Sequence, residues 1–279
     1  MCGIIGYIGK REVVPVLLEG LKRMEYRGYD SAGLAVIHDG VITIKKEVGK
    51  ISKLEKLLGN DLPPGCLGIG HTRWATHGVP SVVNAHPHID SQCHIALIHN
   101  GIFENYALLR QRLEARGHVF RTETDTETLA HLIEEAYQGD LLEAVKIALL
   151  QVKGTYGLAV ITDREPDRIV AARLGSPLII GVGEDENFVA SDLAAIVPYT
   201  RNAIYLEDGE VALIQRDSIQ HRTLNNQLIR KRIESVYLDI EQIDAEGDHG
   251  TASNARGFHA RQVAGRGRNS EVGRDRRLY

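Results

Sequence analysis

The second residue of the chain is a cysteine followed by glycine, and it is the first place where the sequence offers chemistry. Removal of Met1 leaves the thiol and the α-amino group of Cys2 on the same residue. An α-amine has a pKa of about 7.7–8.0, so it can accept the proton of an attacking thiol near neutral pH. Cys2 is therefore a predicted nucleophile that carries its own base. The alternative is an incidental cysteine at a frayed chain end.

Residues 71–78, with the sequence HTRWATHG, follow a predicted strand and could bind an anionic group. The guanidinium of Arg73 can hold a carboxylate through two parallel hydrogen bonds. Trp74 could form the wall or the gate of a pocket. A plain polar loop, with Arg73 in a surface ion pair, is the alternative interpretation of this segment.

The pair Asn100-Gly101 stands at the end of another predicted strand. The side-chain amide of Asn100 and the backbone N–H of Gly101 together could form an oxyanion hole, because two donors that face a developing negative charge stabilise it. Asn-Gly is also a common turn pair. A simple turn at this point is therefore the alternative.

Asp125 lies between Thr124 and Glu127, which together fit a capping box at the start of a helix. A carboxylate in the first turn of a helix is stabilised by the helix dipole and held in place. The sequence therefore predicts that Asp125 could bind an ammonium group. The capping prediction and the binding prediction are compatible.

The spacing of apolar residues changes several times along the chain, and these changes separate the strands and helices that must position the residues described above. Strands are predicted at 3–9, 34–38, 41–48, 66–70, 94–99, 156–162, 168–173, 178–182, 188–191, 203–206 and 211–215, and helices at 13–24, 105–116, 126–137 and 141–152. Asp39-Gly40 and Asp208-Gly209 indicate tight turns between strands. Many strands with frequent hairpins and grouped helices predict an α+β fold, with two mostly antiparallel sheets between helical layers.

Composition and charge exclude several classes of function. The net charge of −4 gives no reason to expect nucleic acid or a membrane surface as a partner. No stretch of about 20 apolar residues is present, so no membrane span is predicted. The three cysteines, an odd and low number, favour a reducing, cytoplasmic compartment. The histidines between residues 71 and 99 match no helical two-histidine ligand pattern, so neither a metal nor a cofactor is predicted.

Several separated motifs, taken together, resemble one known family. The motifs are CGI at residues 2–4, EYRGYDSAG at 25–33, HTRWATHG at 71–78, NAHPH at 84–88, HNG at 99–101 and TDTE at 124–127. They resemble, in the same order, the glutaminase domain of the glutamine–fructose-6-phosphate aminotransferases. The likeness covers about residues 2–245. It implies a four-layer αββα sandwich of the N-terminal nucleophile hydrolase type.

The resemblance also implies a role for each matching residue. It implies that Cys2 attacks the side-chain amide of L-glutamine and that Asn100 and Gly101 stabilise the oxyanion. The same resemblance assigns the substrate carboxylate to Arg73, the substrate ammonium to Asp125 and support of the nucleophile to Arg27. The remaining pocket residues that it implies are Trp74, Thr76 and His77.

The chain also departs from the family pattern. Family members continue into two sugar-isomerase domains that bind fructose 6-phosphate, and we expect these to be missing here. Residues 246–279 are rich in glycine and arginine and poor in aliphatic residues, so they are predicted to be disordered. We hypothesise that a frameshift near Asn254 produced this tail. Reading another frame of the DNA tests that hypothesis.

The sequence thus predicts a glutaminase that releases ammonia from glutamine through a thioester, without the isomerase half of the reaction. Two alternatives stay open. One is an N-terminal nucleophile hydrolase that acts on a different amide. The other is a non-catalytic glutamine-binding fragment, which an electrophilic glutamine analogue would fail to label at Cys2.

Overall fold

The computed structural model describes residues 2–236. The predicted disordered tail, residues 246–279, lies outside the described residues. The helices are α1 (Val13–Lys22), α2 (Ile51–Leu58), α3 (Tyr106–Glu114), α4 (Thr126–Ala136) and α5 (Leu141–Leu149), with 3-10 turns at Glu25–Arg27 and Leu193–Ala195. None of the helices within residues 2–236 is long and apolar enough to cross a membrane.

The first sheet has eight strands and is built around the N-terminal strand. In spatial order it contains β15 (Glu234–Ser235), β11 (Asn202–Tyr205), β9 (Ile179–Val182), β10 (Asn187–Ala190), β1 (Gly3–Ile8), β4 (Leu67–Arg73), β2 (Ser31–His38) and β3 (Val41–Val48). Strands β2 and β3 form a hairpin in which Asp39 and Gly40 both have positive φ, as a type I′ turn requires. β1 lies between β10 and β4, so the chain start is held on both sides.

The second sheet has seven strands and carries the Asn100-Gly101 segment. In spatial order it contains β14 (Leu228–Ile229), β13 (Ile219–Thr223), β12 (Glu210–Gln215), β8 (Arg168–Leu174), β7 (Gly154–Thr162), β6 (Ile95–Phe103) and β5 (His88–Ile89). Neighbouring strands are antiparallel throughout the ladders of both sheets.

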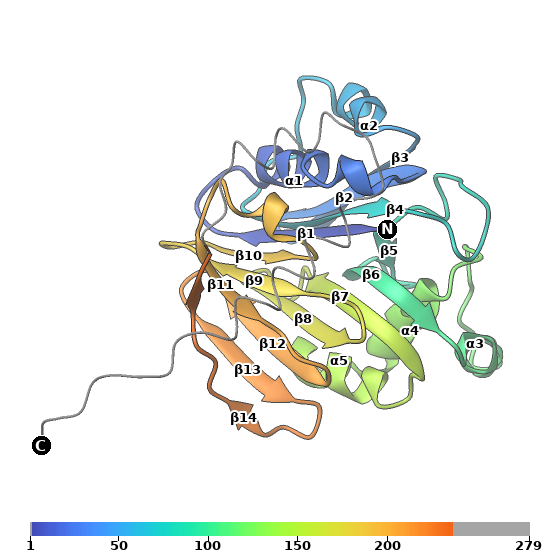
Figure 1. Ribbon diagram of the computed structural model, residues 1–279. Helices are drawn as coiled ribbons and strands as arrows, with labels where there is room; N and C mark the ends of the chain where they lie inside the picture. The colour runs from blue at the N-terminus through green and yellow to red at the C-terminus, as the bar shows by residue number, and fades with distance from the viewer. Residues whose placement is uncertain (1, 237–279) are drawn as a thin grey trace, which may run out of the picture.

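The two sheets pack face to face and helices cover their outer faces, as Figure 1 shows. One buried aliphatic cluster, which includes Ile4, Ile69, Ile98 and Ile161, lies between the sheets. A second cluster joins α1 and α2 to the first sheet, and a third joins α3, α4 and α5 to the second sheet. The result is the four-layer αββα sandwich that the sequence predicted.

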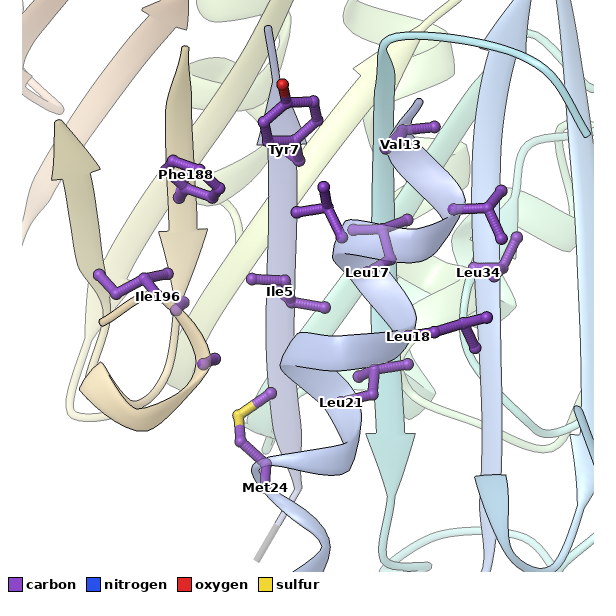
Figure 2. Packing of buried hydrophobic residues seen from close by; sticks show 14 of the residues in the cluster. Ile5, Tyr7, Val13, Leu17, Leu18, Leu21, Met24, Leu34, Phe188 and Ile196 are labelled. Carbon is purple, nitrogen blue, oxygen red and sulfur yellow. The ribbon is translucent and has the colours of Figure 1, made fainter. Parts of the chain in front are cut away.

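Helix α1 shows how the outer layer is fixed. Its buried side chains recur at helical spacing, and Leu17 and Leu21 pack onto β1 near Ile5 (Figure 2). Full burial of one leucine or isoleucine side chain stabilises the fold by about 1.5–3 kcal/mol. This packing holds β1, and with it the adjoining residue Cys2, against the sheet.

The structure corrects some of the predicted elements. β4 continues to Arg73 rather than ending at Gly70, and α2 was not predicted. The predicted capping box is wrong, because the N-cap of α4 is Asp125 and it makes no side-chain cap bond. The hydroxyl of Thr124 instead contacts Nε2 of His88 at 3.1 Å, and Glu127 accepts hydrogen bonds from two backbone N–H groups of the preceding loop.

Candidate active site

The strand register brings the N-terminal cysteine to the end of β4. Gly3 pairs with Thr72, which sets Cys2 beside the residues that follow β4. The backbone N–H of Trp74 donates to Sγ of Cys2 at 3.1 Å. Burial raises the pKa of the Cys2 thiol, against the smaller lowering effect of the Trp74 hydrogen bond. The thiol is therefore mostly protonated at neutral pH and needs a base to become a nucleophile.

Asn100 connects the second sheet to the nucleophile. Its Nδ2 donates to the carbonyl oxygen of Cys2 at 3.2 Å, and its Oδ1 lies 2.9 Å from Nε2 of His71. Burial lowers the pKa of His71 to about 3, so the ring is neutral and Nε2 carries its single proton in this contact. The imidazole of His71 therefore fixes the amide of Asn100 with its NH₂ group turned toward Cys2.

Gly101 occupies a position that only glycine fits. Its φ is +139°, and an added Cβ would lie 2.1 Å from the carbonyl oxygen of Thr155 on the neighbouring strand. Strand β6 therefore passes close to β7 beside Asn100. Glycine at residue 101 allows the backbone beside the Asn100 amide to adopt this positive φ.

Arg73 is 4% exposed, and one side of its guanidinium is already held. Nη2 donates to the carbonyl oxygens of His77 and Gly78, the second at 3.1 Å. Nη1 is buried and has no hydrogen-bond partner among residues 2–236. A buried guanidinium nitrogen without an acceptor is costly. An anionic ligand at this position would supply the acceptor that the protein does not.

Asp125 precedes the first residue of α4 and is 5% exposed. Its Oδ2 accepts the backbone N–H of Phe103 at 2.8 Å, and its Oδ1 is 3.4 Å from the Thr126 hydroxyl. The carboxylate is therefore fixed in direction by β6 and by its own helix. Lone pairs remain on both oxygens for a cationic ligand.

Trp74 lies against Gly28, which directly follows the 3-10 turn at Glu25–Arg27. Gly28 has a φ of +72°, and a Cβ there would lie 2.7 Å from a ring carbon of Trp74. The indole is 56% exposed and borders the cavity beside Thr76 and His77. The ring of His77 meets Tyr106 edge to face, with 5.3 Å between the centroids. Trp74 thus forms an open wall of the cavity.

Arg27 makes a second contact with the carbonyl group of Cys2. Nη1 lies 3.5 Å from the carbonyl oxygen of Cys2, and Nη2 forms an ion pair with Asp192. Tyr26 also donates to Asp192, at 2.5 Å. The carbonyl of Cys2 is therefore contacted by both Arg27 and Asn100, which holds the N-terminal residue in place.

One cavity of about 520 Å³ is lined by all nine residues that the sequence singled out, namely Cys2, Arg27, Arg73, Trp74, Thr76, His77, Asn100, Gly101 and Asp125. The structure therefore brings the whole predicted set together. The cavity wall also contains residues that sequence reasoning missed, among them His71, His86, His99, Thr155 and Ser176. Strand alternation could have found His71, since it lies two residues before Arg73 on β4.

The missed histidines form a buried group in the wall of the cavity. The rings of His71 and His86 stack with centroids 4.2 Å apart, and Nδ1 of His86 accepts the backbone N–H of His99 at 3.2 Å. Burial lowers the pKa of all three residues. Neutral rings of this kind serve as positioning groups. Within residues 2–236, the one group of three side chains close enough to share a metal ion lies outside this cavity.

Comparison with known proteins agrees with this arrangement. Residues 71–198 match the family described as the glutamine amidotransferase domain. The chain is 51% identical over 247 residues to the isomerizing glutamine–fructose-6-phosphate aminotransferase of Thermus thermophilus. The aligned region covers 88% of this chain and 41% of that protein. The protein of the same name from Chlorobaculum tepidum is also 51% identical, over 254 residues, with the same coverage.

A solved structure shares the fold. The glutamine phosphoribosylpyrophosphate amidotransferase of B. subtilis superposes with a TM-score of 0.70 at 30% identity, over 82% of this chain and 50% of that one. The chain spans 41% of the length of the curated relatives described above. The chain is thus a member of the glutamine amidotransferases with the N-terminal nucleophile hydrolase fold, homologous to the glutaminase part of the glutamine–fructose-6-phosphate aminotransferases.

Proposed function

We propose that the domain at residues 2–245 hydrolyses L-glutamine to glutamate and ammonia through a thioester on Cys2. The observation that carries this proposal is the composition of one cavity. It combines a thiol, a buried guanidinium with a free nitrogen at Arg73 and a fixed carboxylate at Asp125. Glutamine offers one amide, one carboxylate and one ammonium group, which these three side chains complement.

In the first step the α-amine of Cys2, freed by removal of Met1, takes the thiol proton as sulfur attacks the amide carbon of glutamine. The Nδ2 of Asn100 and the N–H of Gly101 stabilise the negative oxygen of the tetrahedral intermediate. The C–N bond then breaks. The leaving nitrogen takes the proton from the α-ammonium and departs as ammonia, so the acyl group remains on sulfur.

In the second step a water molecule attacks the thioester. The α-amine accepts a proton from this water, and the same two donors stabilise the second oxyanion. Collapse of the intermediate breaks the C–S bond, releases glutamate and returns the proton to the thiolate. The free thiol and the free amine are thus restored, and neither step uses a metal or a cofactor.

Arg73 and Asp125 hold the α-carbon end of glutamine in this proposal, and Trp74, Thr76 and His77 enclose that end. Arg27 positions the N-terminal residue through its contact with the carbonyl of Cys2. In a longer parent protein, sugar-isomerase domains would receive the ammonia and transfer it to fructose 6-phosphate. We place the reaction in the cytoplasm, because Cys2, Cys66 and Cys93 are all free thiols.

An ammonia-release assay tests the proposal. We expect the chain to release ammonia from L-glutamine and not from L-asparagine, whose side chain is one methylene shorter. Cys2→Ala should abolish release while circular dichroism shows an unchanged fold. Cys66→Ala is the matched control, since Cys66 is an exposed free thiol outside the cavity, and it should keep full activity. Equal ammonia release by Cys2→Ala and the unsubstituted chain would refute the proposal.

A further inference from the structure

A second cluster of polar side chains lies where α4 meets the turn at Ser91 and the loop after α3, outside the cavity of Cys2. His131 and Glu134 belong to α4, and His118 follows α3. One donor atom of each residue lies within 4.8 Å of the others. Imidazole nitrogen and carboxylate oxygen are both common zinc ligands.

Four of the six distances among the donor atoms match the edges of a tetrahedral site. Oε2 of Glu134 lies 3.4 Å from Nδ1 of His118 and 3.2 Å from Nδ1 of His131. The hydroxyl oxygen of Ser91 lies 3.4 and 3.3 Å from the same two nitrogens. A tetrahedron whose ligands are about 2.0–2.1 Å from zinc has edges of about 3.3–3.4 Å. The three atoms of His118, His131 and Glu134 all lie within 4.8 Å of one another, so one ion can contact them together.

The other nitrogen of each ring already faces a carboxylate. Nε2 of His118 lies 3.3 Å from Oε1 of Glu135. Nε2 of His131 lies 3.7 Å from Oε1 of Glu127, too far for a hydrogen bond, and has no hydrogen-bond partner among residues 2–236. Metal-binding histidines usually donate their second N–H to a carboxylate, as the position of His118 beside Glu135 allows, and this contact fixes the tautomer and the direction of the ring. The backbone N–H of Ser91 donates to Oε2 of Glu134 at 3.2 Å and supports the third ligand.

Proton counting favours a cation over hydrogen bonds alone. Three of the four nitrogens of His118 and His131 lie within 3.4 Å of carboxylate oxygens, whereas two neutral rings carry only two N–H protons. Protons alone could satisfy these three contacts only if one of the two rings, whose centroids are 4.9 Å apart, were charged. One divalent ion would replace the two Nδ1 protons and leave each ring neutral.

Charge and burial agree with this interpretation. Three carboxylates, those of Glu127, Glu134 and Glu135, surround two rings, and the Arg116 guanidinium is bound to Glu135. The side chains of the three ligands are 14%, 1% and 11% exposed for His118, His131 and Glu134. Such shielding from water strengthens the attraction between a carboxylate and a cation.

We propose that His118, His131 and Glu134 bind one zinc ion, with Ser91 or a water molecule as the fourth ligand. The site joins three segments: the turn at Ser91, the loop after α3 and the helix α4. Helix α4 begins directly after Asp125. The zinc ion would therefore stabilise the element that carries one wall of the glutamine cavity, without any part in the reaction itself.

Calorimetric titration of the full chain with Zn²⁺, after treatment with a chelator, tests the proposal. We expect one ion per chain and a higher melting temperature when zinc is present. His118→Gln and Glu134→Gln should each weaken binding at least 100-fold. Glu135→Gln, which leaves all ligands in place, should weaken it about 10-fold. Co²⁺ should give the visible absorption of a tetrahedral site in the unsubstituted chain and not in the His118→Gln or Glu134→Gln variant.

His94→Gln is the matched control, because His94 pairs with Asp163 and does not belong to the cluster. It should bind zinc as the unsubstituted chain does. Circular dichroism of each variant shows whether it is folded before titration. Absence of zinc binding at micromolar concentration would overturn the proposal. So would equal affinity of the unsubstituted chain and a folded His118→Gln or Glu134→Gln variant.

Discussion

Nε2 of His71 on β4 lies 2.9 Å from Oδ1 of Asn100 on β6, so a histidine of the first sheet orients an amide of the second. The same amide donates through Nδ2 to the carbonyl oxygen of Cys2. His71 is buried and uncharged, and the ring of His86 stacks on it. The geometry of the proposed oxyanion hole therefore depends on a residue that need not touch the substrate.

Replacement of His71 by leucine should lower kcat for glutamine and leave KM nearly unchanged. Leucine fills the space but cannot donate to Oδ1, so the Asn100 amide is free to rotate. We expect a loss of about 10-fold, against about 10²–10³-fold for Asn100→Ala, which removes the donor itself. Steady-state kinetics of the double variant should show no further loss beyond Asn100→Ala. Fully multiplicative losses would show that His71 acts in another way.

Arg73→Lys should weaken glutamine binding, although it keeps the positive charge. The planar guanidinium of arginine has two terminal nitrogens, one for the Gly78 carbonyl oxygen and one for a substrate carboxylate. Lysine has a single ammonium nitrogen and cannot place two donors in this fixed arrangement. We expect KM to rise about 5–150-fold, which corresponds to the 1–3 kcal/mol of a charged hydrogen bond. 4-Aminobutanamide, which is glutamine without its carboxylate, should be hydrolysed equally by both forms. An unchanged KM for glutamine would contradict the role of Arg73.

Asp125→Asn should weaken binding of the substrate ammonium while the local fold persists. The asparagine side chain can still accept the N–H of Phe103 through its own oxygen. We expect KM for glutamine to rise about 10-fold or more, and KM for glutaramate, which lacks the amino group, to stay the same. Equal changes for the two substrates would show that the carboxylate of Asp125 does not bind the ammonium.

Gly101→Ala should destabilise the chain and impair the reaction together. An alanine at a φ of +139° is strained, and its Cβ would meet the Thr155 carbonyl oxygen. Backbone strain of this kind costs about 1–3 kcal/mol. Urea denaturation measures this loss of unfolding free energy. Gly40→Ala is a useful comparison, because Gly40 also has positive φ but no atom lies within 4 Å of its added Cβ. It should be less destabilising.

Acid should destabilise the chain through its buried histidines. Burial lowers the pKa of His71 to about 3 and those of His86 and His88 well below 6.5. Below pH about 6.5 the unfolded chain therefore binds more protons than the folded chain. The contribution of these neutral histidines to the unfolding free energy is fully present above that pH and is lost as the pH falls. Each histidine contributes up to about 1.4 kcal/mol per pH unit. Urea denaturation at pH 7 and pH 5 measures the effect, and equal free energies would contradict it.

The sequence predicted the site better than the elements that carry it. Cys2, Arg73, Asn100 and Asp125 were identified by side-chain chemistry and by motif, and neither depends on knowing the strand pairing. Their common cavity is a consequence of register, since β1 pairs with β4 and Asn100 of β6 reaches Cys2 across the two sheets. Long-range pairing of this kind leaves no local pattern in the sequence.

The errors have local causes. Residues 71–73 were predicted to be loop because they are polar. They instead continue β4, and all three side chains are buried. The capping box failed because Glu127 turns back to the N–H groups of Arg121 and Thr122. Local propensity could not foresee this choice, since it depends on where the preceding loop lies.

The central claim is that the thiol of Cys2 attacks glutamine with its own α-amine as the base. The most direct measurement is intact mass after reaction with an electrophilic glutamine analogue, on chains with Met1 removed and with Met1 retained. We predict one adduct, located on Cys2, in the processed chain and none in the chain that keeps Met1. Labelling and ammonia release at full rate with Met1 in place would contradict the account.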